Sequence, residues 1–246
     1  MNADSIKKTL DSLNLENAYS LAADEKREFL LEILKKLTVF HAENCRGYRN
    51  FLDVFSSDPS DWVRVEQVPP MPVRLFKMHD LFSIDSGSIA KTLTSSGTSG
   101  SNVSKIFLDA ETAKRQSRIL AAITMNFIGK RRFPMVIVDS SDLLKDRTKL
   151  NARAAGILGY SVFGRDHFYC LDKNLEVLAA DLSAYLKKYN KGPILIFGFT
   201  FVVWQRLLQY ALNNGITFDF GDQSILIHGG GWKKLSDQQV DNSEFK

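Results

Sequence analysis

The spacing of apolar residues separates a helical beginning from an alternating remainder. Within residues 24–55, apolar side chains recur at steps of three and four, which places them on one face of a helix. We therefore expect residues 1–56 to be helical, with Asp24 as a helix cap and an interruption within 44–48. Residues 57–91 contain clusters of proline, serine and aspartate, so we expect an extended connecting segment there.

From about residue 92 onward, short continuous apolar runs alternate with helix-like patterns. The runs at 135–138, 193–198 and 224–228 are typical of strands buried on both faces, which points to a mostly parallel sheet covered by helices. The fold class is therefore α/β, and ligands are expected at the carboxyl ends of the strands. A further strand is expected near 160–163, and helices at 111–128, 148–158, 174–189 and 200–213.

Composition and charge exclude several classes of protein. The 246 residues are 44% hydrophobic and 24% charged, which is typical of a folded globular chain. The net charge of +4 is spread over 32 basic and 28 acidic residues, whereas a nucleic-acid binder concentrates its basic residues in a stripe. We interpret the one short cluster, 130–132, as a solvated helix end.

Neither the apolar runs nor the cysteines indicate a membrane or metal protein. No apolar run approaches the ~18 residues of a membrane helix, so we expect a cytoplasmic protein with no membrane span. Cys45 and Cys170 are too few for a disulfide framework and lack metal-ligand spacing. We expect two buried thiols and no metal site formed by the protein alone.

A polar loop between residues 94 and 105 is the strongest candidate for chemistry. Its hydroxyl and backbone N–H donors suit the charged oxygens of a polyphosphate, and its glycines let the backbone approach a ligand. The loop has neither the Gly-Lys-Ser/Thr of a Walker loop nor a dinucleotide Gly-x-Gly-x-x-Gly. On composition alone, a flexible linker is an equal alternative. The candidate residues are Ser95, Ser96, Gly97, Thr98, Ser99, Gly100 and Lys105.

A second candidate stands directly after the run at 224–228. There His228 is followed by three glycines, so a flat ring could lie against bare backbone. A glycine-rich turn that only permits close packing is the alternative, and His228 alone is equally a hydrogen-bonded core histidine. Phe199, at a strand-to-helix turn, is either a wall of an acyl pocket or packed core. Asp139 ends a buried strand, and we interpret it as structural. The segment comprises His228, Gly229, Gly230, Gly231 and Trp232.

These two segments carry a resemblance to a known family. Ser96-Gly97-Thr98-Ser99-Gly100 resembles the Ser-Gly-Thr-Thr-Gly phosphate loop of adenylate-forming enzymes. The segment from His228 to Lys233 is similar to that of the acyl-protein synthetases (LuxE family) of bacterial luminescence operons. Further similarity lies in 41–49, 72–77 and 154–160, so the resemblance covers roughly residues 25–246. The family's Pro-Lys after the loop is absent, which leaves Lys105 as either a phosphate contact or a surface lysine.

The resemblance implies an ATP-dependent ligase. It implies that residues 92–246 are the nucleotide-binding part of the large domain of an adenylate-forming enzyme, with ATP and Mg²⁺ as cofactors. A long-chain fatty acid or other carboxylic acid would become acyl-AMP, and the acyl group would pass to a protein thiol or other acceptor, such as a reductase- or transferase-like protein. Residues 95–100 would bind phosphates, and residues 228–232 with Phe199 would line the adenine or acyl pocket.

No catalytic residue can be assigned from this resemblance. The family's aromatic-Gly-x-x-Glu motif and its carboxy-terminal lysine do not occur in these residues, so we expect the chain alone to be an incomplete ligase. Two alternatives stay open. One is a catalytically silent interaction or regulatory module, and the other is a relative that resembles aryl- or acyl-CoA ligases.

Overall fold

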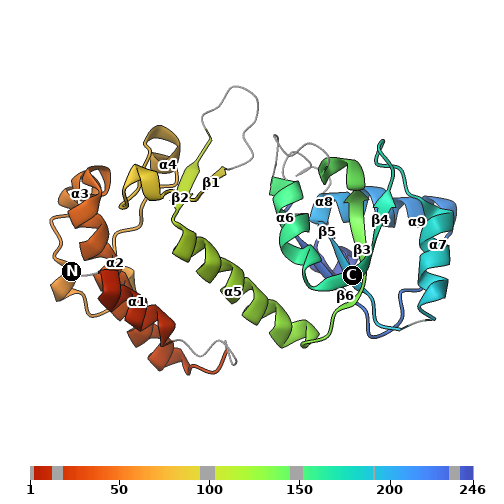
Figure 1. Ribbon diagram of the computed structural model, residues 1–246, viewed down its shortest axis with the longest axis horizontal. Helices are drawn as coiled ribbons and strands as arrows, with labels where there is room; N and C mark the ends of the chain where they lie inside the picture. The colour runs from red at the N-terminus through yellow and green to blue at the C-terminus, as the bar shows by residue number, and fades with distance from the viewer. Residues whose placement is uncertain are drawn as a thin grey trace. The chain divides into compact units, whose positions relative to one another are not determined.

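The computed structural model describes residues 3–12, 19–94, 103–144, 152–190, 192–232 and 239–245. The chain forms two compact units, unit 1 (1–129) and unit 2 (130–246), each with its own interior (Figure 1).

Unit 1 begins with three helices. They are α1 (Ala3–Asp11), α2 (Ala23–Asn44) and α3 (Arg46–Asp53). Cys45 adopts an extended conformation between α2 and α3, which is the predicted interruption. The predicted cap at Asp24 is wrong, because Asp24 already lies in the first turn of α2. The backbone N–H of Ala22 instead donates to the Glu25 carboxylate at 3.3 Å.

The segment after α3 consists of short helical turns rather than an extended chain. Trp62 anchors it, since its side chain is buried and its indole N–H donates to Ser57 Oγ at 2.7 Å. The turns are η2 (Pro59–Asp61), η3 (Val65–Gln67), α4 (Leu75–Met78) and η4 (Ser86–Ser88).

An antiparallel hairpin and a long helix complete unit 1. The hairpin pairs β1 (Lys91–Thr94) with β2 (Lys105–Leu108), and α5 (Ala110–Ile128) follows. Asp109 caps α5, because its carboxylate accepts the Thr112 N–H at 2.6 Å. The boundary predicted near residue 92 therefore differs from the division at 129. The hairpin packs within unit 1, for example through the rings of Phe82 and Phe107 at 5.3 Å.

Unit 2 is built on a four-stranded parallel sheet with the strand order β4-β3-β5-β6. This arrangement confirms the predicted α/β class. Its strands are β3 (Phe133–Ser140), β4 (Gly164–Leu171), β5 (Leu195–Phe199) and β6 (Ile225–Gly229). Its helices are η5 (Ser141–Leu144), α6 (Ala152–Ser161), α7 (Ala179–Lys188), α8 (Thr200–Val202), the π-helix η7 (Val203–Leu208), α9 (Gln209–Asn214) and α10 (Asn242–Phe245).

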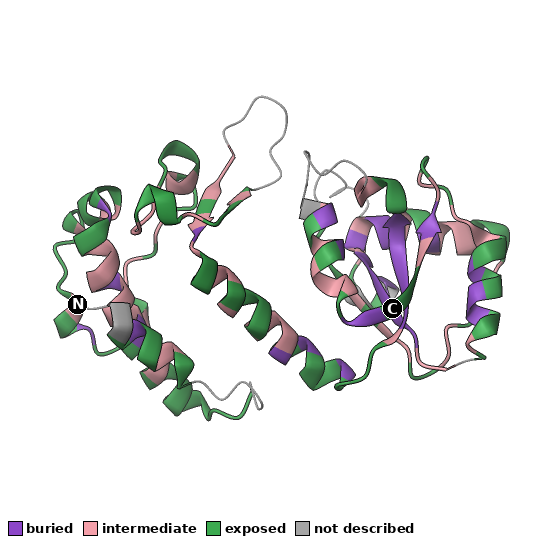
Figure 2. Cartoon of the chain, in the orientation of Figure 1, coloured by how far each residue is buried: buried purple, intermediate pink, exposed green. Residues whose placement is uncertain are grey.

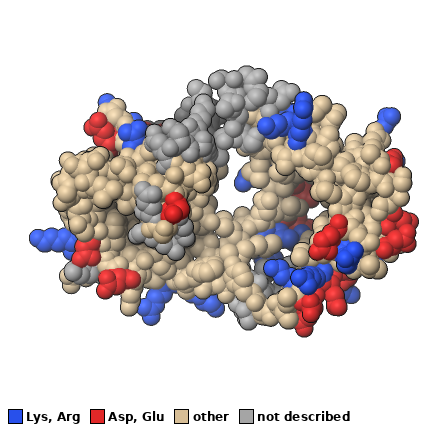
Figure 3. Space-filling model, turned by 180° about the vertical axis from the view of Figure 1, so that it is seen from behind, with Lys and Arg blue, Asp and Glu red and all other residues tan. Residues whose placement is uncertain are grey.

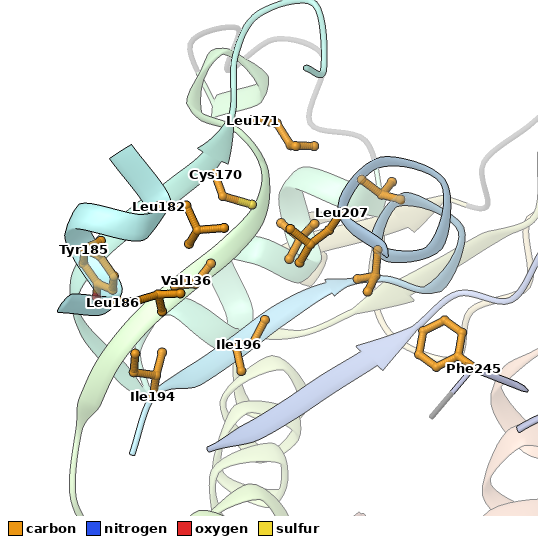
Figure 4. Close-up of a cluster of buried hydrophobic side chains, with 13 residues drawn as sticks. Val136, Cys170, Leu171, Leu182, Tyr185, Leu186, Ile194, Ile196, Leu207 and Phe245 are labelled. Atoms are coloured by element: carbon orange, nitrogen blue, oxygen red, sulfur yellow. The ribbon is translucent and has the colours of Figure 1, made fainter. Parts of the chain in front are cut away.

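Helices cover both faces of this sheet, which explains why its central strands are apolar without interruption. On one face, Val136 and Ile196 form a cluster with side chains of α7 and of η7. On the other face, the α6 residue Tyr160 stacks on Phe197 at 4.6 Å. Successive side chains of a strand point to opposite faces, so each of Met135, Val136, Ile137 and Val138 is fully buried. Figure 4 shows the cluster that contains Val136 and Ile196.

Two elements of unit 2 depart from the expected positions. The strand expected near 160–163 is wrong, because α6 continues to Ser161 and β4 begins at Gly164. The third helix begins at Ala179 rather than near 174. The residues before it form a turn in which the Asp172 carboxylate accepts the N–H groups of Asn174 and Glu176.

The two outer strands of the sheet differ in character. At β4, Arg165, Asp166 and His167 are exposed, Asp166 has φ +47°, and the register with β3 shifts near Met135. At β6, Leu226 is 39% exposed and all five residues pair in register with β5. No strand among the described residues pairs with the outer side of β6.

The structure bears on two predictions made from the composition, one about a basic stripe and one about membrane-crossing helices. On the face shown in Figure 3, Lys and Arg side chains are interspersed with Asp and Glu rather than gathered in one stripe. Among the described helices, none combines the length and the apolar character that a membrane crossing requires.

Candidate functional site

The carboxyl ends of β5 and β6 bring the second candidate segment together. In the parallel register Gly198 pairs with His228, and Phe199 pairs with Gly229. Phe199 and the glycine turn are therefore neighbours at the edge of the sheet where ligands of such folds gather.

Within the glycine turn, Gly230 and Gly231 both have a positive φ, the latter +59°, but only at Gly230 would a Cβ meet a neighbouring side chain. A Cβ at Gly230 would lie 2.6 Å from Cδ1 of Phe199, and its φ of +92° is one that other residues rarely adopt. Packing against Phe199 therefore accounts for this glycine. No described atom lies within 4 Å of a Cβ built at Gly229 or Gly231, so the bare backbone at these two positions faces open space.

His228 is exposed and is held by a buried threonine. Its Nδ1 lies 3.1 Å from Oγ1 of Thr200, which is 8% exposed. Its ring stacks on Phe245 with 4.6 Å between centroids, so His228 is a surface group fixed in orientation rather than a core histidine.

An aromatic cluster continues from His228. Trp204, from the π-helix, stacks on Phe245 at 5.9 Å and meets Trp232 edge to face at 5.9 Å. The cluster unites residues from three separate segments, and sequence reasoning named only His228 and Trp232 among them. Trp204 lies in a π-helical turn, and such turns often occur at functional sites, but this turn is visible only in the structure.

A buried ion pair stands at the carboxyl end of the neighbouring strand β3. The Asp139 side chain is 2% exposed and accepts two bonds from Arg153 of α6, at 2.5 and 3.0 Å. It also accepts the backbone N–H of Ser140 at 2.8 Å. Asp139 thus has a structural role, as interpreted from the sequence, and its carboxylate also fixes the Arg153 guanidinium near the same edge of the sheet. Sequence reasoning missed Arg153.

The first candidate segment belongs to unit 1. Ser95, Ser96, Gly97, Thr98, Ser99 and Gly100 lie outside the described residues, between the two strands of the hairpin. Lys105 begins β2, and its ammonium lies 3.0 Å from the Asp80 carboxylate with 44% of the side chain exposed. A phosphate at Lys105 would have to compete with Asp80 for this ammonium.

Neither the thiols nor the acidic side chains indicate further chemistry. Burial raises the pKa of the Cys170 thiol to about 12, so this buried cysteine remains protonated and a poor nucleophile. Cys45 is also buried. Within the described ranges, no three His, Cys, Asp or Glu side chains are grouped to hold a metal ion.

The arrangement at the ends of β5 and β6 therefore offers a platform for a planar ligand. It combines bare backbone at two glycines, an oriented imidazole and an aromatic cluster. Such groups bind a flat ring by stacking and contribute no nucleophile of their own.

Comparison with known proteins gives consistent matches. The family model described as acyl-protein synthetase, LuxE, matches residues 3–246. The chain is 25% identical over 233 residues to a long-chain-fatty-acid–luciferin-component ligase of Aliivibrio fischeri, and 26% identical over 236 residues to that of Vibrio harveyi. These alignments cover 90% of this chain but only 58% and 57% of the relatives.

Solved structures support the fold. A 2-hydroxyisobutyryl-CoA ligase with its acyl-adenylate in the postadenylation state matches 89% of this chain and 46% of its own, with a TM-score of 0.59 and 17% identity. An open conformation of the same ligase with the adenylate and CoA matches 89% of this chain and 48% of its own, with a TM-score of 0.60 and 16% identity. The described fold is thus that of adenylate-forming ligases.

Proposed function

Because the chain belongs to the acyl-protein synthetase (LuxE) family, we propose that this protein activates a long-chain fatty acid with ATP and transfers the acyl group to a protein thiol or another acceptor. The names of the two luminescence relatives support the substrate class. The adenylate bound to the structural relatives supports the intermediate. The observation that carries the proposal is the open backbone at Gly229 and Gly231, beside the oriented His228.

Two displacements make up the proposed reaction. A carboxylate oxygen of the fatty acid attacks the α-phosphorus of ATP, the bond from that phosphorus to the bridging oxygen breaks, and pyrophosphate leaves. The acceptor thiolate then attacks the acyl carbon of the acyl-AMP, and AMP leaves as the thioester forms. Both steps build negative charge on oxygens that positioned donors can stabilise.

We assign the phosphate contacts to the loop of residues 95–100, with Lys105 as an additional cation if Asp80 releases it. The loop's hydroxyl and N–H donors would bind the β- and γ-phosphate oxygens. The turn formed by residues 228–232 would seat the adenine or the start of the acyl chain, with Phe199 as the wall behind Gly230.

Mg²⁺ fits this assignment as an ion that arrives with ATP. It commonly binds nucleotide phosphates and only one or two carboxylates. That agrees with the described residues, which hold no acidic cluster of their own. When bound, it would neutralise charge on the phosphate oxygens.

Acid-dependent exchange of labelled pyrophosphate into ATP, measured on the natural full-length polypeptide that contains these residues, tests the proposal. We expect exchange with tetradecanoate, and a loss of at least tenfold in Ser96→Ala, whereas Ser117→Ala on the exposed side of α5 serves as the matched control. No exchange with any aliphatic or aromatic acid would remove the ligase proposal and favour a silent module. Exchange restricted to aryl acids, or acyl transfer only to CoA, would indicate an aryl- or acyl-CoA ligase instead.

A further inference from the structure

Unit 1 contains a cavity of about 610 Å³ that is partly open to solvent. Its walls come from α1, α2, Cys45 and α3, the segment 71–84, strand β2 and the first turns of α5. The cavity lies wholly within unit 1 and contains none of the candidate residues discussed above. Its size falls in the ~300–1,000 Å³ range of small-molecule sites in proteins.

The inner side chains of unit 1 face this space instead of filling it. Phe40, Phe76, Phe82 and Phe107 line the cavity, yet each is only half-buried. In unit 2 the corresponding central residues, such as Val136, are fully buried. Figure 2 shows the contrast, with buried strands in unit 2 and mainly intermediate or exposed ribbon in unit 1. Apolar walls of this kind gain stability when an apolar ligand displaces water from them.

The polar groups around the cavity already have partners. His41 Nδ1 lies 2.8 Å from Ser83 Oγ, and burial lowers the pKa of His41, which favours the neutral ring. Lys7 pairs with Glu111 at 3.1 Å. A charged ligand group that enters beside these side chains would therefore have to break one of these contacts.

The Arg115 guanidinium is likewise engaged. It lies 3.2 Å from the Asp11 carboxylate and 3.3 Å from that of Glu111. The remaining lining is mainly hydrocarbon and aromatic, which favours an occupant that is apolar over most of its length.

We propose that this cavity binds the hydrocarbon chain of a long-chain acyl group. Rings of phenylalanine suit a flexible alkyl chain. If a methylene group takes about the volume of one water molecule, ~30 Å³, the cavity accommodates a chain of roughly 12 to 16 carbons with space to spare. The choice of an acyl chain rests on the proposed function. The strand that lines the cavity, Ile106 to Leu108, also follows the loop assigned to phosphate.

Binding of 1-dodecanol to the purified 246-residue chain tests this inference, because the alcohol carries the chain without the carboxylate. We expect saturable binding that shifts the methyl NMR signals of Leu37, Ile84 and Ile106 while leaving those of Leu182 in unit 2 unchanged. 1-Hexanol should bind at least tenfold more weakly.

Two substitutions in α2 give a matched pair. Leu37→Trp fills the cavity and should weaken dodecanol binding at least tenfold, whereas Leu30→Trp, on an exposed position of the same helix, should change it less than twofold. Should Leu37→Trp not fold, an alkyl-diazirine analogue of dodecanol on the unsubstituted chain gives the same information. It should label peptides of unit 1 that line the cavity.

The outcomes separate this inference from the proposed function. Absence of saturable binding, equal effects of the two tryptophans, or labels confined to unit 2 would each overturn the cavity assignment. Dodecanol binding without any pyrophosphate exchange would keep the cavity as an alkyl site and remove the ligase proposal. Exchange with tetradecanoate that Leu37→Trp leaves unchanged, together with no dodecanol binding, would do the reverse.

Discussion

Gly229 and Gly230 are adjacent, and the structure predicts that substitution by alanine lowers stability at Gly230 but not at Gly229. Gly230→Ala places a residue at φ +92° and a Cβ 2.6 Å from Cδ1 of Phe199. A non-glycine residue in the left-handed region costs about 1–2 kcal/mol. Overpacking costs about 1–3 kcal/mol, and here the added Cβ would meet two ring atoms of Phe199, Cδ1 at 2.6 Å and Cε1 at 3.1 Å. We expect a loss of about 2–5 kcal/mol.

Gly229→Ala is the matched control. It ends β6 with an ordinary φ and no described atom within 4 Å of its Cβ, so it should be neutral or slightly stabilising. Under the proposed function it should instead weaken binding of an acyl-AMP analogue, since the added methyl group occupies the open backbone.

Hydrogen exchange read by mass spectrometry measures both variants without assuming that the two units unfold together. Peptides from β5 and β6 should exchange roughly 30- to 4,000-fold faster in Gly230→Ala, because each ~1.4 kcal/mol is a factor of ten. Adding Phe199→Leu should recover part of the loss, because it removes the clash but leaves the backbone strain. Equal protection in the two alanine variants, or strict additivity with Phe199→Leu, would refute the reasoning.

Three further outcomes follow from buried polar groups. Asp139→Asn leaves the charge of Arg153 without its partner and should reduce the stability of unit 2 by about 2–4 kcal/mol in calorimetry. The control Asp166→Asn breaks an exposed ion pair and should hardly move the unfolding transition. Equal shifts in the two variants would contradict this reasoning. Because the pKa of the Cys170 thiol is raised to about 12 in the fold, the stability that it contributes is complete below the unfolded pKa of ~8.5 and is lost as the pH rises towards 12. Thiol reagents at pH 8 should therefore modify it only on unfolding, and rapid labelling of the native chain would be inconsistent with its burial. Because burial lowers the pKa of His41, the stability of unit 1 should fall as the pH drops below ~6.5, and His41→Asn should flatten that dependence in pH-resolved melting curves.

The central sheet could be read from the sequence because burial on both faces leaves a simple signature. The apolar runs at 135–138 and 193–198 correspond to the buried strands β3 and β5. The run at 224–228 corresponds to β6, but its predicted burial on both faces is wrong, because β6 is an outer strand in which no residue is fully buried. The outer strand β4 could not be found in this way, because its exposed residues at 165–167 interrupt the apolar pattern.

The candidate site was only partly accessible to sequence reasoning. The glycine turn stands directly after a strand, so its place at the carboxyl edge followed from topology alone. The pairing of Asp139 with Arg153 did not, because the two are 14 residues apart and meet only through the docking of α6 on the sheet. The contact of Phe245 with His228 likewise depends on a distant segment that no local pattern connects.

The unlike edges of the sheet in unit 2 have a consequence for how it can be extended. An outer strand with a left-handed residue, a register shift and charged side chains is a poor template for another strand, and β4 has all three. β6 has regular pairing on its inner side and an apolar residue exposed. A strand added to this sheet would therefore pair more readily with β6 than with β4.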